Sequence, residues 1–222
     1  MLIVPTLLVP TYNELAKQLK KVKPFFDYAQ LDIMDGQLVE NKSFNYNEDR
    51  NFSKFFNDEI KIKLKYELHL IVKNPLNEIA KWKKVKNVFR VIFHIEADDD
   101  PAKIIAKICA NGWQAGIALN PETPLRKITP YLNLIDVVLF MTVHPGQQGA
   151  SFLPEVGEKI KIFNTGGGTT KPIIAVDGGI NANNIAMVKS WGVEVFNIGS
   201  VLMNAKDIKK AYKELAIKTK LT

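Results

Sequence analysis

The chain has 222 residues, 46% hydrophobic and 24% charged, so it can bury a large core without help from disulfides or metals. Its net charge of +7 comes from lysines spread along the chain, not from an aromatic-interleaved basic patch, which argues against a nucleic-acid partner. The single cysteine, Cys109, excludes an internal disulfide; we expect a packed core thiol in a cytoplasmic protein.

The chain starts with an apolar segment that contains Pro5 and Pro10 and lacks a basic leader. It therefore predicts a first strand, not a signal peptide. No later stretch is long and apolar enough to cross a bilayer, so we expect no membrane partner.

Runs rich in β-branched and apolar residues predict eight strands, at 2–8, 28–34, 64–72, 88–95, 114–119, 137–141, 173–177 and 195–198. Amphipathic patterns predict helices, most clearly at 12–22, 77–85, 101–111, 153–163, 182–190 and 206–217. Asn74, Asp100 and Asn181 are capping residue types at expected helix starts. The polar segment 40–63 predicts a loop with a short helix.

Apolar strands alternating with helices predict a parallel sheet covered on both faces. Eight such units fit a closed (β/α)8 TIM barrel better than an open sheet. No linker or composition break divides the chain, so we expect one α/β domain over residues 1–222. In this fold, side chains at the carboxyl ends of the strands meet at one mouth.

Two aspartate-bearing runs end predicted strands, and they contain Asp32 and Asp177. Alternation puts Asp32 on the same strand face as Gln30 and Met34, with Asp35 on the other face. A carboxylate inside a barrel is costly unless it is paired, ligated or functional. We therefore predict a functional Asp32 and an Asp35 that caps the following turn.

The three histidines differ in context. His69 lies near the carboxyl end of the third predicted strand, where we expect a functional and a structural role equally. His94 has no surrounding acid pattern that demands catalysis, and we expect it to be structural. His144 precedes Pro145 in a loop, where contact with an anion or substrate is possible.

Glycine-bearing turns follow each of the last three strands. Glycine lets backbone N–H groups approach an anion, and loops after the last strands of this fold often hold phosphate. A sugar phosphate is therefore the leading ligand. The turns contain Gly146, Gln147, Gln148, Gly149, Gly178, Gly179, Gly199 and Ser200.

At this point the sequence resembles the ribulose-phosphate 3-epimerase family over nearly its whole length. Several motifs occur in the family's order, among them Leu-Asp-Ile-Met-Asp-Gly from Leu31, Leu-His-Leu from Leu68, Phe-His-Ile-Glu-Ala from Phe93 and Val-Asp-Gly-Gly from Val176. The resemblance implies a (β/α)8 barrel that inverts C3 of a ketopentose 5-phosphate through a cis-enediolate.

The resemblance also implies roles for individual residues. Asp32 and Asp177 would be the acid/base pair, and with His69 they would ligate a divalent metal such as Zn, Fe, Mn or Co. Thr6 and His69 would contact the substrate, Met34 and Met141 would shield the intermediate, and the glycine turns would hold the phosphate. A homo-oligomer is also implied.

One departure from the family pattern concerns the metal. Gln30 stands where the family has a histidine ligand, and an amide oxygen is a weaker ligand for zinc or iron than imidazole. The metal could persist on three ligands, or it could be lost. An epimerase on another ketose phosphate, such as a 6-phosphorylated hexulose, and a non-catalytic sugar-phosphate-binding barrel are the alternatives. A phosphate-binding isomerase of amino-acid biosynthesis is a third.

Overall fold

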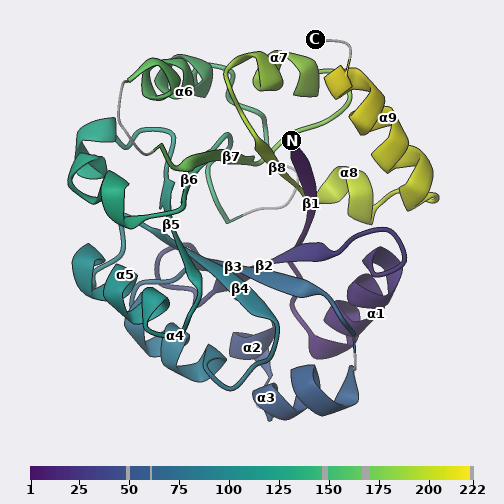
Figure 1. Ribbon diagram of the computed structural model, residues 1–222. Coiled ribbons are helices and arrows are strands. Elements are labelled where there is room, and N and C mark those ends of the chain that lie inside the picture. The colour runs from purple at the N-terminus through teal and green to yellow at the C-terminus, as the bar shows by residue number, and fades with distance from the viewer. Residues whose placement is uncertain (49–50, 61, 147–149, 167–170, 221–222) are drawn as a thin grey trace.

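Eight parallel strands close into a barrel in the computed structural model, which describes residues 1–48, 51–60, 62–146, 150–166 and 171–220. Each strand pairs with the next, and the first pairs with the last, with helices around the outside (Figure 1). The (β/α)8 prediction is confirmed. The strands are β1 Leu2–Leu7, β2 Tyr28–Met34, β3 Lys65–Ile71, β4 Val88–His94, β5 Gln114–Leu119, β6 Val137–Met141, β7 Ile173–Asp177 and β8 Val195–Ile198.

The outer layer is formed by helices of very different length. The α-helices are α1 Tyr12–Val22, α2 Phe44–Asn47, α3 Phe52–Lys54, α4 Pro75–Trp82, α5 Pro101–Cys109, α6 Val156–Thr165, α7 Ile185–Ser190, α8 Ser200–Met203 and α9 Ile208–Lys220. A π-helix, η1 Phe55–Glu59, follows α3, and two 3₁₀ helices, η2 Leu125–Lys127 and η3 Thr129–Leu134, lie between β5 and β6.

Strand bounds follow the sequence closely. β2, β5, β6, β7 and β8 have the predicted bounds, and the other three strands are shorter by one residue at one or both ends. Hydrophobic runs predict the strands well here, because a strand that is covered on both faces is apolar along its length. Helix starts were less accurate, since α4, α6, α7 and α9 do not begin where the patterns predict.

The three predicted caps have different outcomes. Asp100 caps α5 by accepting a hydrogen bond from the Lys103 N–H. Asn74 stands at the N-cap position of α4, as expected, but its side chain makes no capping hydrogen bond, and the Asp99 carboxylate accepts from the Leu76 N–H instead. Asn181 caps no helix, because its side chain accepts from the N–H of Asn183 within a turn that precedes α7.

The prediction of a packed Cys109 is wrong, because this residue is exposed. Helix α5 buries Ile104, Ile105 and Ile108 against the sheet. Cys109 follows Ile108 by one residue, which turns it about 100° around the helix axis and away from the sheet.

The apolar core has two parts. The larger part lies between the outer face of the sheet and the helices. The smaller part fills the inside of the barrel and includes Val4, Ile92, Ala118, Leu139 and Ala175. Because strand side chains alternate, the residues in phase with these apolar ones also point inward and form the mouth and floor of the barrel.

A buried carboxylate of α4 contributes to holding the polar segment 40–63 against the barrel. Glu78 of α4 is fully buried and accepts hydrogen bonds from Asn45 Nδ2 at 2.9 Å, Tyr46 Oη at 2.5 Å and Trp82 Nε1 at 3.0 Å. Lys81 Nζ lies 2.9 Å from the same carboxylate. Donors from both sides therefore join this segment to α4.

We expect Glu78→Ala to lower the free energy of unfolding by about 3 kcal/mol, because it leaves buried donors unpaired. Denaturant unfolding measures this. The matched control is Glu158→Ala, which breaks an exposed i,i+3 pair with Lys161 and should cost less than about 0.5 kcal/mol. Equal losses in the two variants would show that the buried carboxylate does not join the segment to the barrel.

Candidate active site

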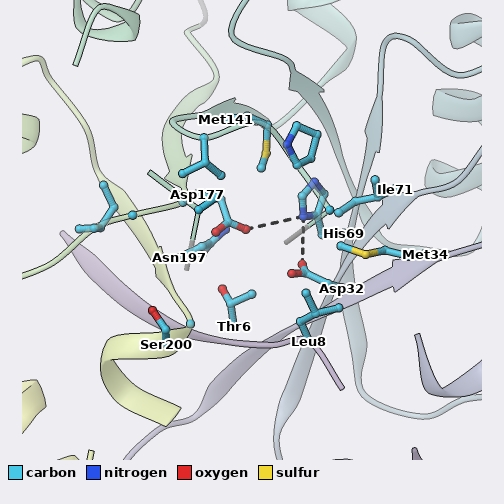
Figure 2. Close-up of a pocket in the computed structure, with 18 residues that line it drawn as sticks. Thr6, Leu8, Asp32, Met34, His69, Ile71, Met141, Asp177, Asn197 and Ser200 are labelled. Atoms are coloured by element: carbon cyan, nitrogen blue, oxygen red, sulfur yellow. Dashed lines mark hydrogen bonds and ion pairs between the residues drawn. The ribbon is translucent and has the colours of Figure 1, made fainter. Parts of the chain in front are cut away.

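A pocket opens at the carboxyl ends of the strands, on the inward-facing side chains of the barrel (Figure 2). It brings together residues that are far apart in sequence but end neighbouring or facing strands. The predicted site residues that line it are Thr6, Asp32, Met34, His69, Met141, Gly146, Asp177, Gly178, Gly179, Gly199 and Ser200.

Gln147, Gln148 and Gly149 fall outside the described residues. The side chain of His144 is 68% exposed, its Nδ1 lies 3.2 Å from Glu122 Oε1, and this residue does not line the pocket. Asp35 acts as expected, because Oδ1 accepts from the Gln37 N–H at 2.9 Å while Oδ2 accepts from the Lys73 N–H.

Two buried carboxylates dominate the electrostatics of the pocket. Asp32 of β2 and Asp177 of β7 are each 7% exposed. Burial raises the pKa of Asp32 to about 7. Burial, together with the nearby charge of Asp32, raises the pKa of Asp177 to about 8. Without a cation, the pair therefore retains a proton near neutral pH.

His69 faces both carboxylates. Its Nδ1 lies 3.0 Å from Asp32 Oδ1 and 3.6 Å from Asp177 Oδ2, the two contacts drawn in Figure 2. The strand register explains the first contact, because Asp32 and His69 are direct partners in the β2–β3 pairing. Burial lowers the pKa of His69, so its imidazole is neutral at neutral pH.

A relay behind His69 determines which of its nitrogens carries the proton. Glu96, which only accepts, lies 3.1 Å from His94 Nδ1, so that nitrogen is protonated. His94 Nε2 must then accept from His69 Nε2, 3.0 Å away. Burial keeps His94 neutral by lowering its pKa. The Nδ1 lone pair of His69 therefore points at the two aspartates.

Glu96 is itself held in place. Burial opposes its charge, but the hydrogen bond from His94 and those from Thr123 and the Asn120 N–H lower the pKa of this carboxyl. It therefore stays ionised and keeps accepting from His94.

The donor set fits a divalent cation. One ligand atom from each of Asp32, His69 and Asp177 lies within 4.8 Å of the others. Two carboxylate oxygens and an imidazole lone pair that converge on one point repel each other unless a proton or a cation lies between them. Oxygen and imidazole nitrogen ligands suit Zn, Fe, Mn and Co.

The glycine turns also line the pocket. Gly178 has a φ of +113°, and a Cβ placed there would lie 2.4 Å from Val143 Cγ2, so only glycine fits. Thr142 fixes this turn, because its hydroxyl donates to the Asp177 and Gly178 carbonyl oxygens. Gly199 and Ser200, at the start of α8, lie across the mouth.

Gln30 lies directly below the carboxylates and is fully buried. Its amide nitrogen donates to Asp177 Oδ2 at 2.5 Å and to Asp32 Oδ1 at 3.1 Å. The amide oxygen faces Asn197 Nδ2 on β8. Gln30 therefore presents a donor, not a ligand oxygen, to the two aspartates.

The sequence did not point to Asn197, and we expected His94 to be only structural. A usable signal exists for His94, since Glu96 follows it by two residues and so lies on the same side of the chain. Asn197 gave no such signal, because its partners Gln30 and Glu67 are distant in sequence and are brought together only by barrel closure.

Comparisons with known proteins agree with this architecture. The family model described as the ribulose-phosphate 3 epimerase family matches residues 2–203. Ribulose-phosphate 3-epimerase of Methanocaldococcus jannaschii is 32% identical over 215 residues, 95% of this chain and 87% of the relative. The enzyme of the same name from Mycobacterium bovis is 30% identical over 211 residues, 93% and 87% of the two chains.

Among solved structures, 3-hexulose-6-phosphate synthase from Salmonella typhimurium superposes with a TM-score of 0.69 over 100% of this chain and 99% of its own. Its sequence identity of 15% supports the shared fold alone. Within the described residues, no helix has the length and apolar character needed to span a membrane.

We expect the metal-free protein to lose stability as pH rises from 6 to 9. Folded Asp177, with its pKa near 8, retains a proton that the unfolded chain releases near pH 4. Asp177→Asn removes this group, so the wild-type free energy of unfolding should fall by roughly 1–3 kcal/mol more than that of the variant over this range. Urea unfolding in the presence of a chelator measures the free energy of unfolding of both proteins at each pH. Parallel pH profiles of the wild type and the variant would contradict the raised pKa of Asp177.

We expect His94→Phe to weaken metal binding by about 10–100-fold, because it removes the acceptor that holds the His69 tautomer. Competition against a chromophoric chelator measures the affinity, and circular dichroism checks the fold. Unchanged affinity in a folded variant would show that the relay does not orient His69.

Proposed function

This chain belongs to the ribulose-phosphate 3 epimerase family and is an epimerase-like isomerase, and from that premise we propose that it interconverts D-ribulose 5-phosphate and D-xylulose 5-phosphate. The observation that carries this proposal is the pair Asp32 and Asp177, buried on β2 and β7 and facing one pocket with His69 between them. The names of the relatives supply the substrate class.

The placement of the two carboxylates suits inversion at carbon. Strands β2 and β7 are separated on the ring by β1 and β8, so the aspartates reach the pocket from different sides. One carboxylate would remove the C3 proton and the other would return a proton from the opposite face, through a cis-enediolate. A single proton held between two carboxylates is the starting state that such an exchange needs.

Other residues of the pocket would bind the substrate and exclude water. Met34 and Met141 are buried beside the carboxylates and would cover the planar intermediate. Thr6 places a hydroxyl in the same pocket. The backbone N–H groups of the turns at Gly178 and Gly199 would hold the phosphate.

Asp32, His69 and Asp177 would hold the divalent cation, since they form the converging donor set. When bound, such an ion supplies Lewis-acid polarisation of the substrate carbonyl and stabilises charge on the enediolate oxygens.

A second candidate function is that of a barrel that binds a sugar phosphate without catalysing its epimerisation. The specific observation in its favour is Gln30, which replaces a family histidine ligand and points its amide nitrogen at the carboxylates. Retention of both aspartates and His69 favours the epimerase.

Solvent exchange separates the two candidates. We expect purified protein in D2O to incorporate deuterium at C3 of ribulose 5-phosphate, and both Asp32→Asn and Asp177→Asn to reduce exchange at least about 10³-fold, because each removes one proton-transfer group. NMR or mass spectrometry of the sugar measures this.

The matched control is Asp35→Asn, three residues from Asp32 on the other strand face, which should retain exchange. Binding of the sugar phosphate without exchange, with Zn, Fe, Mn and Co each supplied, would establish the non-catalytic barrel instead.

A further inference from the structure

A buried ion pair lies inside the barrel below the two carboxylates. Arg90 Nη1 of β4 lies 2.8 Å from Glu67 Oε2 of β3, and their side chains are 7% and 1% exposed. Arg90 also donates from Nε and Nη2 to Gln114 Oε1 of β5. Glu67 and Arg90 are register partners, as are Arg90 and Gln114, so the closed sheet fixes this row.

Glu67 determines the orientation of the Asn197 side-chain amide. A carboxylate only accepts hydrogen bonds, so the group of Asn197 that faces Glu67 Oε1 at 3.1 Å must be its NH2. The same NH2 group donates its second proton to Gln30 Oε1. Asn197 Oδ1 is left buried, with no hydrogen-bond partner among the residues that the structure describes. The carboxylate of Glu67 therefore fixes this orientation at the cost of one unpaired oxygen.

Asn197 then determines the orientation of the Gln30 side-chain amide. Because the amide oxygen of Gln30 accepts from Asn197, its NH2 group must face upward, where Asp32 and Asp177 accept. A reversed Gln30 would place its oxygen against two carboxylates and its NH2 against another NH2. Asn197 lies beside Asp177 (Figure 2), because the two residues are register partners of β7 and β8.

We propose that Asn197, anchored by the Glu67–Arg90 ion pair, is a positioning residue that fixes Gln30 as a hydrogen-bond donor to Asp32 and Asp177. Gln30 is then no metal ligand, and the cation is held by three protein ligands. The ligand assignment rests on the proposed function, whereas the orientation of Gln30 does not.

NMR of metal-free protein labelled with ¹⁵N-glutamine tests the orientation directly. We expect NOEs from the Gln30 side-chain NH2 to the Thr6 side chain, since Nε2 lies 3.3 Å from Thr6 Oγ1. Asn197→Asp should turn the amide over, because an acceptor then faces Gln30, and these NOEs should be lost. NOEs from this NH2 to the Glu67 methylenes in the wild type would overturn the proposal.

Co²⁺ alone, followed by its visible absorption, tests the ligand assignment. We expect Gln30→Leu to keep the wild-type spectrum, since no ligand is removed, and to weaken Co²⁺ binding by about 10–100-fold, since it removes a donor that orients two ligand carboxylates. Gln30→His should change the spectrum and tighten binding at least about tenfold. A changed spectrum in Gln30→Leu would overturn the assignment, because it would show that the ligand set includes Gln30.

Gln114→Leu is the matched control, because it removes a partner of Arg90 without touching Asn197, and it should leave the NOEs and the spectrum unchanged. Circular dichroism verifies the fold of every variant. If Asn197→Asp does not fold, Asn197→Leu is measured in its place. Thr6 NOEs of wild-type intensity in Asn197→Leu would show that Asn197 does not position Gln30. A protein that fails to exchange C3 hydrogen leaves the NMR result intact, so the two failures are distinguishable.

Discussion

Asp32 and Asp177 place two like charges in one buried volume, and the side chains around them are arranged to make that burial tolerable. Removing a carboxylate from water costs several kcal/mol unless protons, donors or cations compensate it. Here Gln30 donates to both carboxylates from below, and His69 offers a lone pair that a shared cation or proton can complete. The raised pKa values of both aspartates show how incomplete this compensation is without a cation.

Polar and apolar side chains occupy different parts of the barrel interior, and this separation makes the site possible. Strands β2 and β3 send Gln30, Asp32, Glu67 and His69 inward, whereas Ala118 of β5, Leu139 of β6 and Ala175 of β7 form an apolar part of the interior next to Asp177. The polar half forms a continuous chain of donors and acceptors from the floor to the mouth. The orientation of each amide in this network is fixed, because reversing any one of them would set acceptor against acceptor.

The sequence predicted the barrel and most of the pocket because both depend on local periodicity. Alternation within β2 separated Asp32 from Asp35, and the structure places the first in the pocket and the second in a turn. Where partners come from distant segments, local reasoning was weaker. Cys109 is exposed and Asn181 caps no helix, because the packing of α5 and the late start of α7 are decided by the sheet beneath them.

The barrel fold and the side chains that share a strand face follow from the sequence alone, because apolar strands alternate with helices and strand side chains alternate with period two. The direction of the Gln30 amide and the tautomer of His69 do not. Each is determined by a chain of partners that begins at a group with one fixed hydrogen-bonding role, the Glu67 carboxylate and the Glu96 carboxylate. Only closure of the barrel brings those partners within hydrogen-bonding distance.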